Sequence, residues 1–174
     1  MTVVADAGPL IALAKINGLD ALFDLHPSLL ITPTVYDEAI TAGLALGAED
    51  AVRLQQAHEA GHVEVRAPTL PRLPVSASLG AGEVDSIRLA IDLIADWLLV
   101  DDLEARRAAQ QNFETAHVST AIQGTLGVIV SSFRAGHVSR EKAIELIQAI
   151  KGRPDIWISA ELCDRVLESL KQAA

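Results

Sequence analysis

The chain has 174 residues, of which 50% are hydrophobic, and this length fits one domain with a full core. Its formal net charge of −9 at pH 7 is opposite to the basic balance of proteins that bind phosphate backbones with their own side chains. Aromatic residues make up only 3% of the chain, which argues against a protein that binds nucleic acid by stacking bases on aromatic platforms. A nucleic-acid ligand would therefore require bound metal, held by clustered acids, together with locally placed Arg or Lys.

The cysteine content and the N-terminal residues indicate a reduced, cytoplasmic setting. Cys163 is the only cysteine, which excludes an internal disulfide and a cysteine-based zinc cluster, and its apolar neighbours predict a buried thiol. The N-terminus lacks the basic segment and cleavage site of a signal peptide. The longest apolar stretches are too short and too charged to span a membrane, so we expect no membrane partner.

The first residues predict a buried strand that ends in a carboxylate. The short apolar run from Val3 is followed by Asp6, and Gly8-Pro9 then bends the chain into a helix from Leu10 to Ile16. Open α/β sheets bind ligands outside the carboxyl ends of their strands. The Asp6 carboxylate therefore either faces solvent or takes part in ligand binding at that edge.

The later segments alternate between apolar runs and helical periodicity. The predicted elements are a helical segment over 19–25, a strand over 29–31, a helix over 35–40 capped by Thr32 or Thr34, a helix over 48–60, an edge strand over 62–66, a surface loop over 67–74, a helix from Glu83 through Ile94, a strand over 97–100, a helix over 103–111, a strand over 117–119, a helix over 124–135, and amphipathic helices over 139–151 and 159–171 capped by Ser139 and Ser159.

This alternation predicts an α/β fold with a mostly parallel sheet, built as a single domain over 1–174. The helices from about residue 139 onward either cover one face of the sheet or form a partner surface, such as that of a homodimer.

Several carboxylates are predicted at strand ends or in the first turns of helices. The candidates are Asp6, Glu38, Glu83 or Asp85, and Asp101 or Asp102. Mg²⁺ and Mn²⁺ prefer oxygen ligands, and hydrolases use such acidic clusters to activate water at a phosphodiester. The pattern therefore favours a shared divalent cation site at one edge of the sheet.

Helical phase distinguishes Glu83 from Asp85. Glu83 lies four residues before the apolar Ile87 and continues its buried face, whereas Asp85 aligns with Arg88 on a charged stripe. Glu83 is the preferred ligand and Asp85 the second choice. Alternation along a strand places Asp101 and Asp102 on opposite sides, and both stay candidates.

Each acid also has a purely structural interpretation. Asp6 and either Asp101 or Asp102 suit helix caps, Glu38 suits a solvated helix surface, and Glu83 suits a helix N-terminus. Arg106, one turn beyond the acidic pair, either contacts phosphate or pairs with a surface acid.

Five segments in order resemble the successive motifs of the PIN-domain superfamily, in particular a prokaryotic branch similar to the VapC-type toxins. They are Val-Val-Ala-Asp-Ala-Gly-Pro-Leu-Ile-Ala-Leu (3–13), Thr-Pro-Thr-Val-Tyr-Asp-Glu (32–38), Leu-Gly-Ala-Gly-Glu-Val-Asp-Ser-Ile (79–87), Leu-Leu-Val-Asp-Asp-Leu-Glu-Ala-Arg (98–106) and Gly-Thr-Leu-Gly-Val (124–128).

The resemblance implies an α/β/α sandwich around a parallel sheet and a Mg²⁺- or Mn²⁺-dependent ribonuclease. It implies an RNA substrate and, for a VapC-type member, a cognate antitoxin. The motif acids correspond to Asp6, Glu38, Glu83 and the pair Asp101 and Asp102. The chain departs from the pattern at Gly8, where many PIN domains have Ser or Thr, so a hydroxyl beside the first acid is missing.

The leading hypothesis is a metal-dependent endoribonuclease that acts as the toxin of a toxin–antitoxin pair. The alternative is a non-catalytic PIN-like binding module that acts through protein partners, which Gly8 and the acidic charge favour slightly. A phosphatase on a related sheet ranks lower, because it requires a lysine partner that the spacing does not provide.

Overall fold

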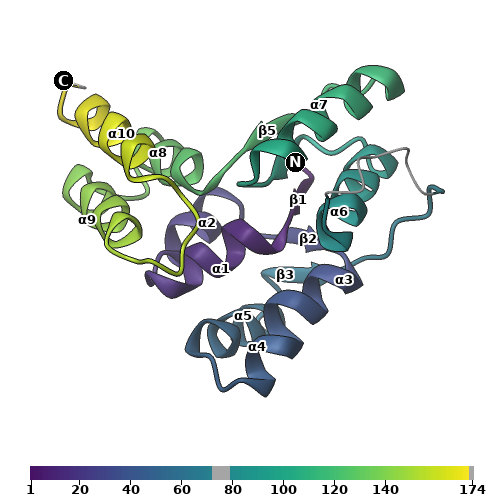
Figure 1. Cartoon of the computed structure of the whole chain (residues 1–174), viewed down its shortest axis with the longest axis horizontal. Helices are drawn as coiled ribbons and strands as arrows, with labels where there is room; N and C mark the ends of the chain where they lie inside the picture. The colour runs from purple at the N-terminus through teal and green to yellow at the C-terminus, as the bar shows by residue number, and fades with distance from the viewer. Residues whose placement is uncertain (72–78, 173–174) are drawn as a thin grey trace.

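The computed structural model describes residues 1–71 and 79–172, and within them a five-stranded parallel sheet lies between two layers of helices (Figure 1). The strands are β1 (Val3–Ala5), β2 (Leu29–Ile31), β3 (Val63–Val65), β4 (Trp97–Leu99) and β5 (Ala121–Gln123). Their order is β3-β2-β1-β4-β5, and every pairing is parallel. The predicted α/β/α sandwich is confirmed.

The strand order reverses at β1. The chain moves from β1 to β2 and β3 on one side, and then crosses to β4 and β5 on the other. In open parallel sheets this reversal leaves a crevice outside the carboxyl ends of the two strands that flank it. Here those strands are β1 and β4. A ligand site is therefore expected beside the residues that follow Ala5 and Leu99.

Helices connect the strands and cover both faces of the sheet. They are α1 (Ala7–Lys15), α2 (Leu19–Leu25), α3 (Pro33–Tyr36), the π-helical turn η1 (Asp37–Thr41), α4 (Ala42–Ala45), α5 (Glu49–Glu59), α6 (Ala81–Asp92), α7 (Leu103–Ala116), α8 (Thr125–Arg134), α9 (Arg140–Lys151) and α10 (Ala160–Gln172). Figure 1 shows α6 and α7 on the opposite side of the sheet from α1, α2 and α8 to α10.

The alternation of side chains along β1 divides the core in two. Val3 and Ala5 pack into the larger apolar cluster, with α1, α5, α8, α9 and α10. Val4 points the other way, into a smaller cluster with α6 and α7 that includes the buried Phe113. Because both faces of the sheet are covered, the central strands contain continuous apolar residues.

The predicted helix caps at three positions are confirmed. Thr32 Oγ1 accepts a hydrogen bond from the backbone N–H of Val35 at 3.2 Å. The hydroxyl oxygens of Ser139 and Ser159 accept from residues three positions later in the same way, at 3.1 and 3.2 Å. These caps satisfy backbone donors that have no partner within the first helical turn. The expected edge strand is also confirmed, because β3 lies at one end of the sheet.

The strand predicted over 117–119 is wrong. His117 has a left-handed backbone, with φ of 55°, and closes α7, which continues to Ala116 rather than ending at residue 111. The fifth strand is Ala121–Gln123, whose side chains are all only half-buried. A half-buried strand that contains a glutamine has a weak apolar signal, and this explains the displaced prediction.

One smaller expectation also differs. The first helix begins at Ala7 rather than Leu10, because Asp6 already acts as its N-cap. Residues 72–74 of the predicted surface loop lie outside the described residues. The single-domain boundary of 1–174 stays a prediction. Cys163 is buried, as expected. Among the helices of the described ranges, none has the length and apolar character needed to cross a bilayer.

Candidate active site

The acids of interest follow the two strands that flank the reversal. Asp6 comes directly after β1, and its backbone N–H donates to the Leu99 carbonyl at the end of β4, at 2.9 Å. Asp101 and Asp102 come just beyond that point. Glu38 lies in η1 and Glu83 in the first turn of α6, so four separate elements contribute carboxylates to one edge of the sheet.

Asp6 is the most buried of these acids, with 7% of its surface exposed. Its carboxylate caps α1 by accepting from the Gly8 N–H at 3.4 Å, and the Ser86 hydroxyl donates to its Oδ1 at 3.5 Å. Burial raises the pKa of Asp6 from 3.8 to about 6, against the lowering effect of the Gly8 and Ala7 N–H groups. The nearby charges that act on it, those of Glu83 and Glu38, are both negative and raise the pKa further.

Gly82 allows Asp6 and Glu38 to approach one another. A Cβ atom at residue 82 would lie 2.5 Å from Glu38 Oε2 and 3.5 Å from Asp6 Oδ1. Both oxygens therefore face the same small space beside the backbone of α6. Any side chain larger than hydrogen at this position would displace the glutamate tip.

Glu83 lies close to the same acids. Its Oε2 accepts a hydrogen bond from the Gly80 N–H at 2.8 Å at the start of α6. Burial raises the pKa of Glu83, the hydrogen bond from Gly80 lowers it, and the negative charges of Asp102 and Glu38 raise it. The helical phase inferred from the sequence is therefore consistent with the position of this side chain.

Asp101 is held by Thr125, the first residue of α8. The Thr125 N–H donates to Oδ1 at 2.8 Å and its hydroxyl donates to Oδ2 at 2.5 Å. Burial raises the pKa of Asp101, while the Thr125 bonds and the Arg106 charge lower it. A Cβ at Gly8 would lie 3.8 Å from Asp6 Oδ2 and 3.9 Å from Asp101 Oδ2, so both carboxylates face this glycine.

Asp102 has a different environment. It is exposed and caps α7 by accepting from the Ala105 N–H at 2.8 Å, while its charge acts on Glu83. Asp101 thus faces Asp6, and Asp102 lies on the outer rim. The capping interpretation of the sequence applies to Asp102 and to Asp6, but a cap uses only part of the hydrogen-bonding capacity of a carboxylate.

Asp85, the second choice, does not join this group. One of its oxygens accepts from the Thr34 hydroxyl at 2.7 Å, and the other pairs with Arg88 at 2.5 Å. Asp85 and Arg88, which the sequence aligns on one stripe of α6, thus form an ion pair.

Three residues of this site were not predicted as its components, namely Ser86, Thr125 and Gly124, whereas Arg106 was considered as a phosphate contact or the partner of a surface acid. Ser86 and Thr125 provide the hydroxyls that the glycine at position 8 does not. Gly124 has no Cβ, which leaves room for the Arg106 guanidinium and for Asp101 Oδ1. Arg106 Nε donates to the Val100 carbonyl at 3.0 Å. For Ser86, the local signal in the sequence is a serine at a position on the apolar face of α6.

The donor chemistry of this edge fits a hard divalent cation, because carboxylate oxygens face one another and the charges around Asp6 are negative. Within residues 1–71 and 79–172, however, no three His, Cys, Asp or Glu side chains are close enough to hold one ion together. The acids approach in pairs, Asp6 with Glu38 and Asp6 with Asp101, without forming a closed three-ligand cage.

The fold is a doubly wound parallel sheet, and acidic side chains follow the strands at which the strand order reverses. The chain is thus an α/β protein with acids at the edge where such sheets bind ligands. The family model described as a PIN domain matches residues 2–172, and the chain belongs to this family. PIN domains are generally nucleases, so the family indicates a nuclease-type function. No curated protein and no solved structure matches the chain.

Proposed function

We propose that the chain is a metal-dependent endoribonuclease that hydrolyses RNA phosphodiester bonds. The ligands of Mg²⁺ or Mn²⁺ in this proposal are Asp6, Glu38, Glu83, Asp101 and Asp102. The observation that carries it is the environment of Asp6, a buried carboxylate whose neighbouring charges are the negative ones of Glu38 and Glu83. Burying like charges together costs free energy, and a bound divalent cation offsets that cost.

The side chains around the acids have positioning roles in this proposal. Thr125 fixes the orientation of Asp101 through two hydrogen bonds, and Ser86 contacts Oδ1 of Asp6. Gly8 and Gly82 leave space in front of the carboxylates. When bound, a divalent cation would supply Lewis acidity toward the phosphodiester and lower the pKa of a water molecule.

The biological role in this proposal is that of a VapC-type toxin, which acts in the cytoplasm and is inhibited by a cognate antitoxin. The order of the five motifs supports it. The surface of the C-terminal helices supports a protein contact there, because Leu162 of α10 is exposed although the helix is amphipathic. A homodimer through these helices is part of this proposal, and its test is the mass of the purified protein in solution.

The test is the melting temperature of the parent and of Asp6→Asn as a function of Mn²⁺ and Mg²⁺. A ligand that binds only the folded state raises the melting temperature in a saturable manner. We expect saturable stabilisation of the parent, its loss in Asp6→Asn, and loss of RNA cleavage in the same variant. Asp85→Asn is the matched control, because this acid pairs with Arg88 outside the cluster and the variant should keep the metal response.

Equal metal responses and equal RNA cleavage in the parent and Asp6→Asn would overturn the proposal. If neither protein responds to metal and the parent leaves RNA intact, the chain is a binding module that acts through partners, and its acids have capping roles only.

A further inference from the structure

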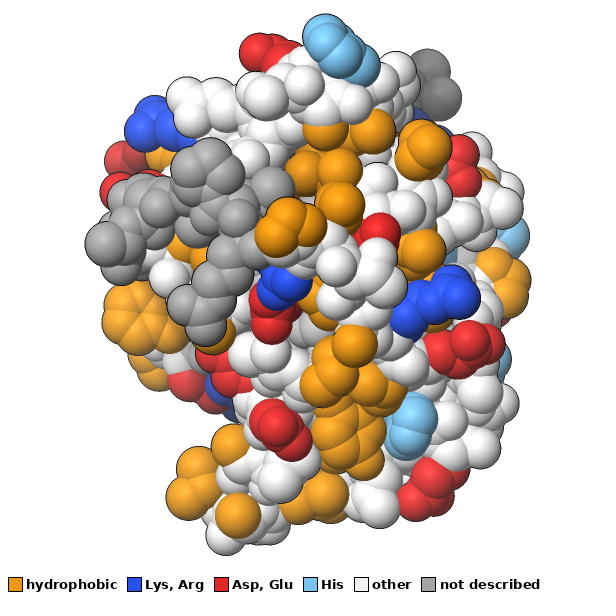
Figure 2. Space-filling model, turned by 90° about the vertical axis from the view of Figure 1, so that its right-hand side faces the viewer, with side chains coloured by type: hydrophobic (Ala, Val, Ile, Leu, Met, Phe, Trp, Pro, Cys, Tyr) orange, Lys and Arg blue, Asp and Glu red, His pale blue; other side chains and the backbone are white. Residues whose placement is uncertain are grey.

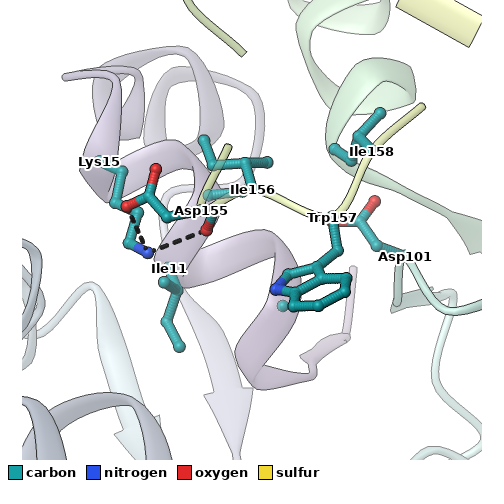
Figure 3. A pocket seen from close by; sticks show the side chains of 9 residues that line it. Ile11, Lys15, Asp101, Asp155, Ile156, Trp157 and Ile158 are labelled. Carbon is teal, nitrogen blue, oxygen red and sulfur yellow. Dashed lines mark hydrogen bonds and ion pairs between the residues drawn. The ribbon is translucent and has the colours of Figure 1, made fainter. Parts of the chain in front are cut away.

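An exposed tryptophan lies at the rim of the acidic edge. Trp157, in the segment that joins α9 to α10, is 98% exposed. Figure 3 shows its indole ring beside Asp101, although the two residues come from different parts of the chain. Both residues line a cavity of about 280 Å³ that also contains Gly8, so the ring borders the space in front of the candidate site.

The backbone around Trp157 is anchored on α1. Lys15 Nζ pairs with Asp155 Oδ2 at 3.0 Å and donates to its carbonyl at 3.1 Å, as the dashed lines in Figure 3 mark. Arg153 pairs with Asp155 and donates to the Lys15 carbonyl at 3.4 Å. Ile156 is buried against the core. The fold therefore holds the segment firmly, yet the indole ring itself contributes little to burial.

The ring also borders a second and larger groove of about 790 Å³. This groove extends from Asp101 and Asp102 toward α10, and its lining includes Arg106, Trp157 and Arg165. Arg165 is exposed, and Arg106 lies between Gly124 and Asp101. An aromatic face, two guanidinium groups and the acids are thus arranged along one depression.

We propose that Trp157 and Arg165 position the RNA in this groove, with one unpaired base stacked on the Trp157 ring and a backbone phosphate beside Arg165. The proposal rests on the proposed nuclease function and names two residues that would position its substrate. Stacking on an aromatic ring requires an unpaired base with a free face, so a duplex does not satisfy this site. Guanidinium groups suit phosphate oxygens because their donors bind in pairs.

The low aromatic content of the chain does not conflict with this assignment. An aromatic content of 3% argues against an extended platform that stacks several bases. One base requires one ring, and the structure places one of the two tryptophans at the site. The overall negative charge also does not decide the matter, because the two arginines are local to the groove.

The test is the binding of a nuclease-resistant oligoadenylate of about eight nucleotides, a length within the site sizes of single-strand grooves. It carries 2′-O-methyl riboses and phosphorothioate linkages, and is titrated in Mg²⁺ against a Trp97→Phe background so that Trp157 is the only indole. We expect quenching of its fluorescence on binding. Trp157→Ala should weaken binding about tenfold, as measured by oligonucleotide anisotropy, and Trp157→Phe should restore part of the affinity. Arg165→Gln should reduce the salt dependence of binding.

Leu46→Ala is the matched control, since Leu46 is 86% exposed in the turn after α4 and is not part of either cavity. Equal affinities of the parent, Leu46→Ala and Trp157→Ala would overturn the inference. So would equal affinity for the same sequence as a duplex. Loss of self-association in Trp157→Ala without any change in oligonucleotide binding would show that the ring contacts protein instead.

These experiments distinguish a failure of the groove assignment from a failure of the nuclease proposal. If the parent binds the oligonucleotide through Trp157 but cleaves no RNA, the nuclease proposal fails and the groove assignment stands. If Trp157→Ala cleaves a short single-stranded RNA with the KM and kcat of the parent, the groove assignment fails and the nuclease proposal stands.

Discussion

Thr125 holds the carboxylate of Asp101 at both oxygens, through its N–H at 2.8 Å and its hydroxyl at 2.5 Å. The threonine is fully buried, so its hydroxyl has no competing water. This pairing joins the first residue of α8 to the residue that follows β4. It fixes the acid that faces Asp6 across Gly8.

Thr125→Val is expected to destabilise the protein by about 2 kcal/mol, because it removes a hydrogen bond to a charged group and leaves Asp101 Oδ2 without that donor. It should also weaken Mn²⁺ stabilisation, since loss of the hydroxyl raises the pKa of Asp101 further. Thermal unfolding with and without Mn²⁺ measures both effects. Thr115→Val is the control: its hydroxyl donates to a helical carbonyl on the exposed face of α7, so its effect should be within about 0.5 kcal/mol. Equal losses in the two variants would show that the Asp101 contact has no special role.

Gly82→Ala tests whether the free space between Asp6 and Glu38 is needed for metal binding. The new Cβ would meet Glu38 Oε2, the end of a flexible side chain on an exposed residue, so the fold should tolerate it. Alanine is also the better helix former by about 1 kcal/mol. We therefore expect an unchanged or higher melting temperature together with weaker Mn²⁺ binding, measured by calorimetric titration.

Gly152→Ala provides the comparison for that experiment, because a Cβ there makes only ordinary contacts at the end of α9. This variant should bind Mn²⁺ like the parent. Unaltered Mn²⁺ affinity in Gly82→Ala would mean that Glu38 takes no part in the site.

The sequence allowed prediction of those acids that depend on local pattern. Two buried apolar runs, each followed by aspartate, pointed to Asp6 and to the pair Asp101 and Asp102 without separating the two, and helical phase favoured Glu83 over Asp85. The site is built on these local features because parallel strands end at a common edge. The same reasoning gave the α/β layers but displaced β5, whose half-buried residues carry little periodic signal.

The residues that connect distant segments were beyond prediction from one sequence. Thr125 reaches Asp101, and Ser86 reaches Asp6, only because α8 and α6 pack on particular strands. The linker that carries Trp157 is joined to α1 by the ion pair of Lys15 with Asp155, two residues far apart in the sequence. No spacing rule relates such residues, since tertiary packing alone brings them together.

Asp6→Asn should raise stability at neutral pH in the absence of metal. The pKa of Asp6 is raised from 3.8 to about 6 in the folded state, so the folded protein binds this proton more tightly than the unfolded chain does. The resulting cost is fully present above about pH 6, declines as the pH falls, and vanishes below 3.8. The asparagine keeps a side-chain oxygen that can cap α1.

The size of that cost is at most about 3 kcal/mol, at 1.36 kcal/mol for each pKa unit. In a domain of this length it corresponds to a melting temperature higher by several degrees at neutral pH. The comparison of variant and parent from about pH 4 to about pH 8 cancels the titration of groups that do not interact with Asp6. A difference that is constant with pH, or a less stable variant at neutral pH, would contradict the raised pKa.

Lys15→Met tests whether the ion pairs of the linker hold Trp157 beside the acids. Methionine keeps an apolar stem but cannot pair with Asp155. In a Trp97→Phe background, we expect faster and larger motion of the Trp157 ring, measured by time-resolved fluorescence anisotropy. The hydrogen bonds from Arg153 and Lys15 hold the pKa of Asp155 below its ordinary value of 3.8. The tether of the parent should therefore be intact above that pH and be lost only as the pH falls below it.

Lys142→Met is the matched control, because Lys142 forms its ion pair with Glu145 within α9 and not with Asp155 of the linker. The melting temperature should change little in either variant, since ion pairs at the surface contribute at most about 1 kcal/mol and at least one partner of each pair is exposed. The distinguishing quantity is the motion of the ring. If the anisotropy decay of Lys15→Met matches those of Lys142→Met and the parent, then Ile156 alone anchors the segment, and the charged contacts with α1 do not determine where the indole lies.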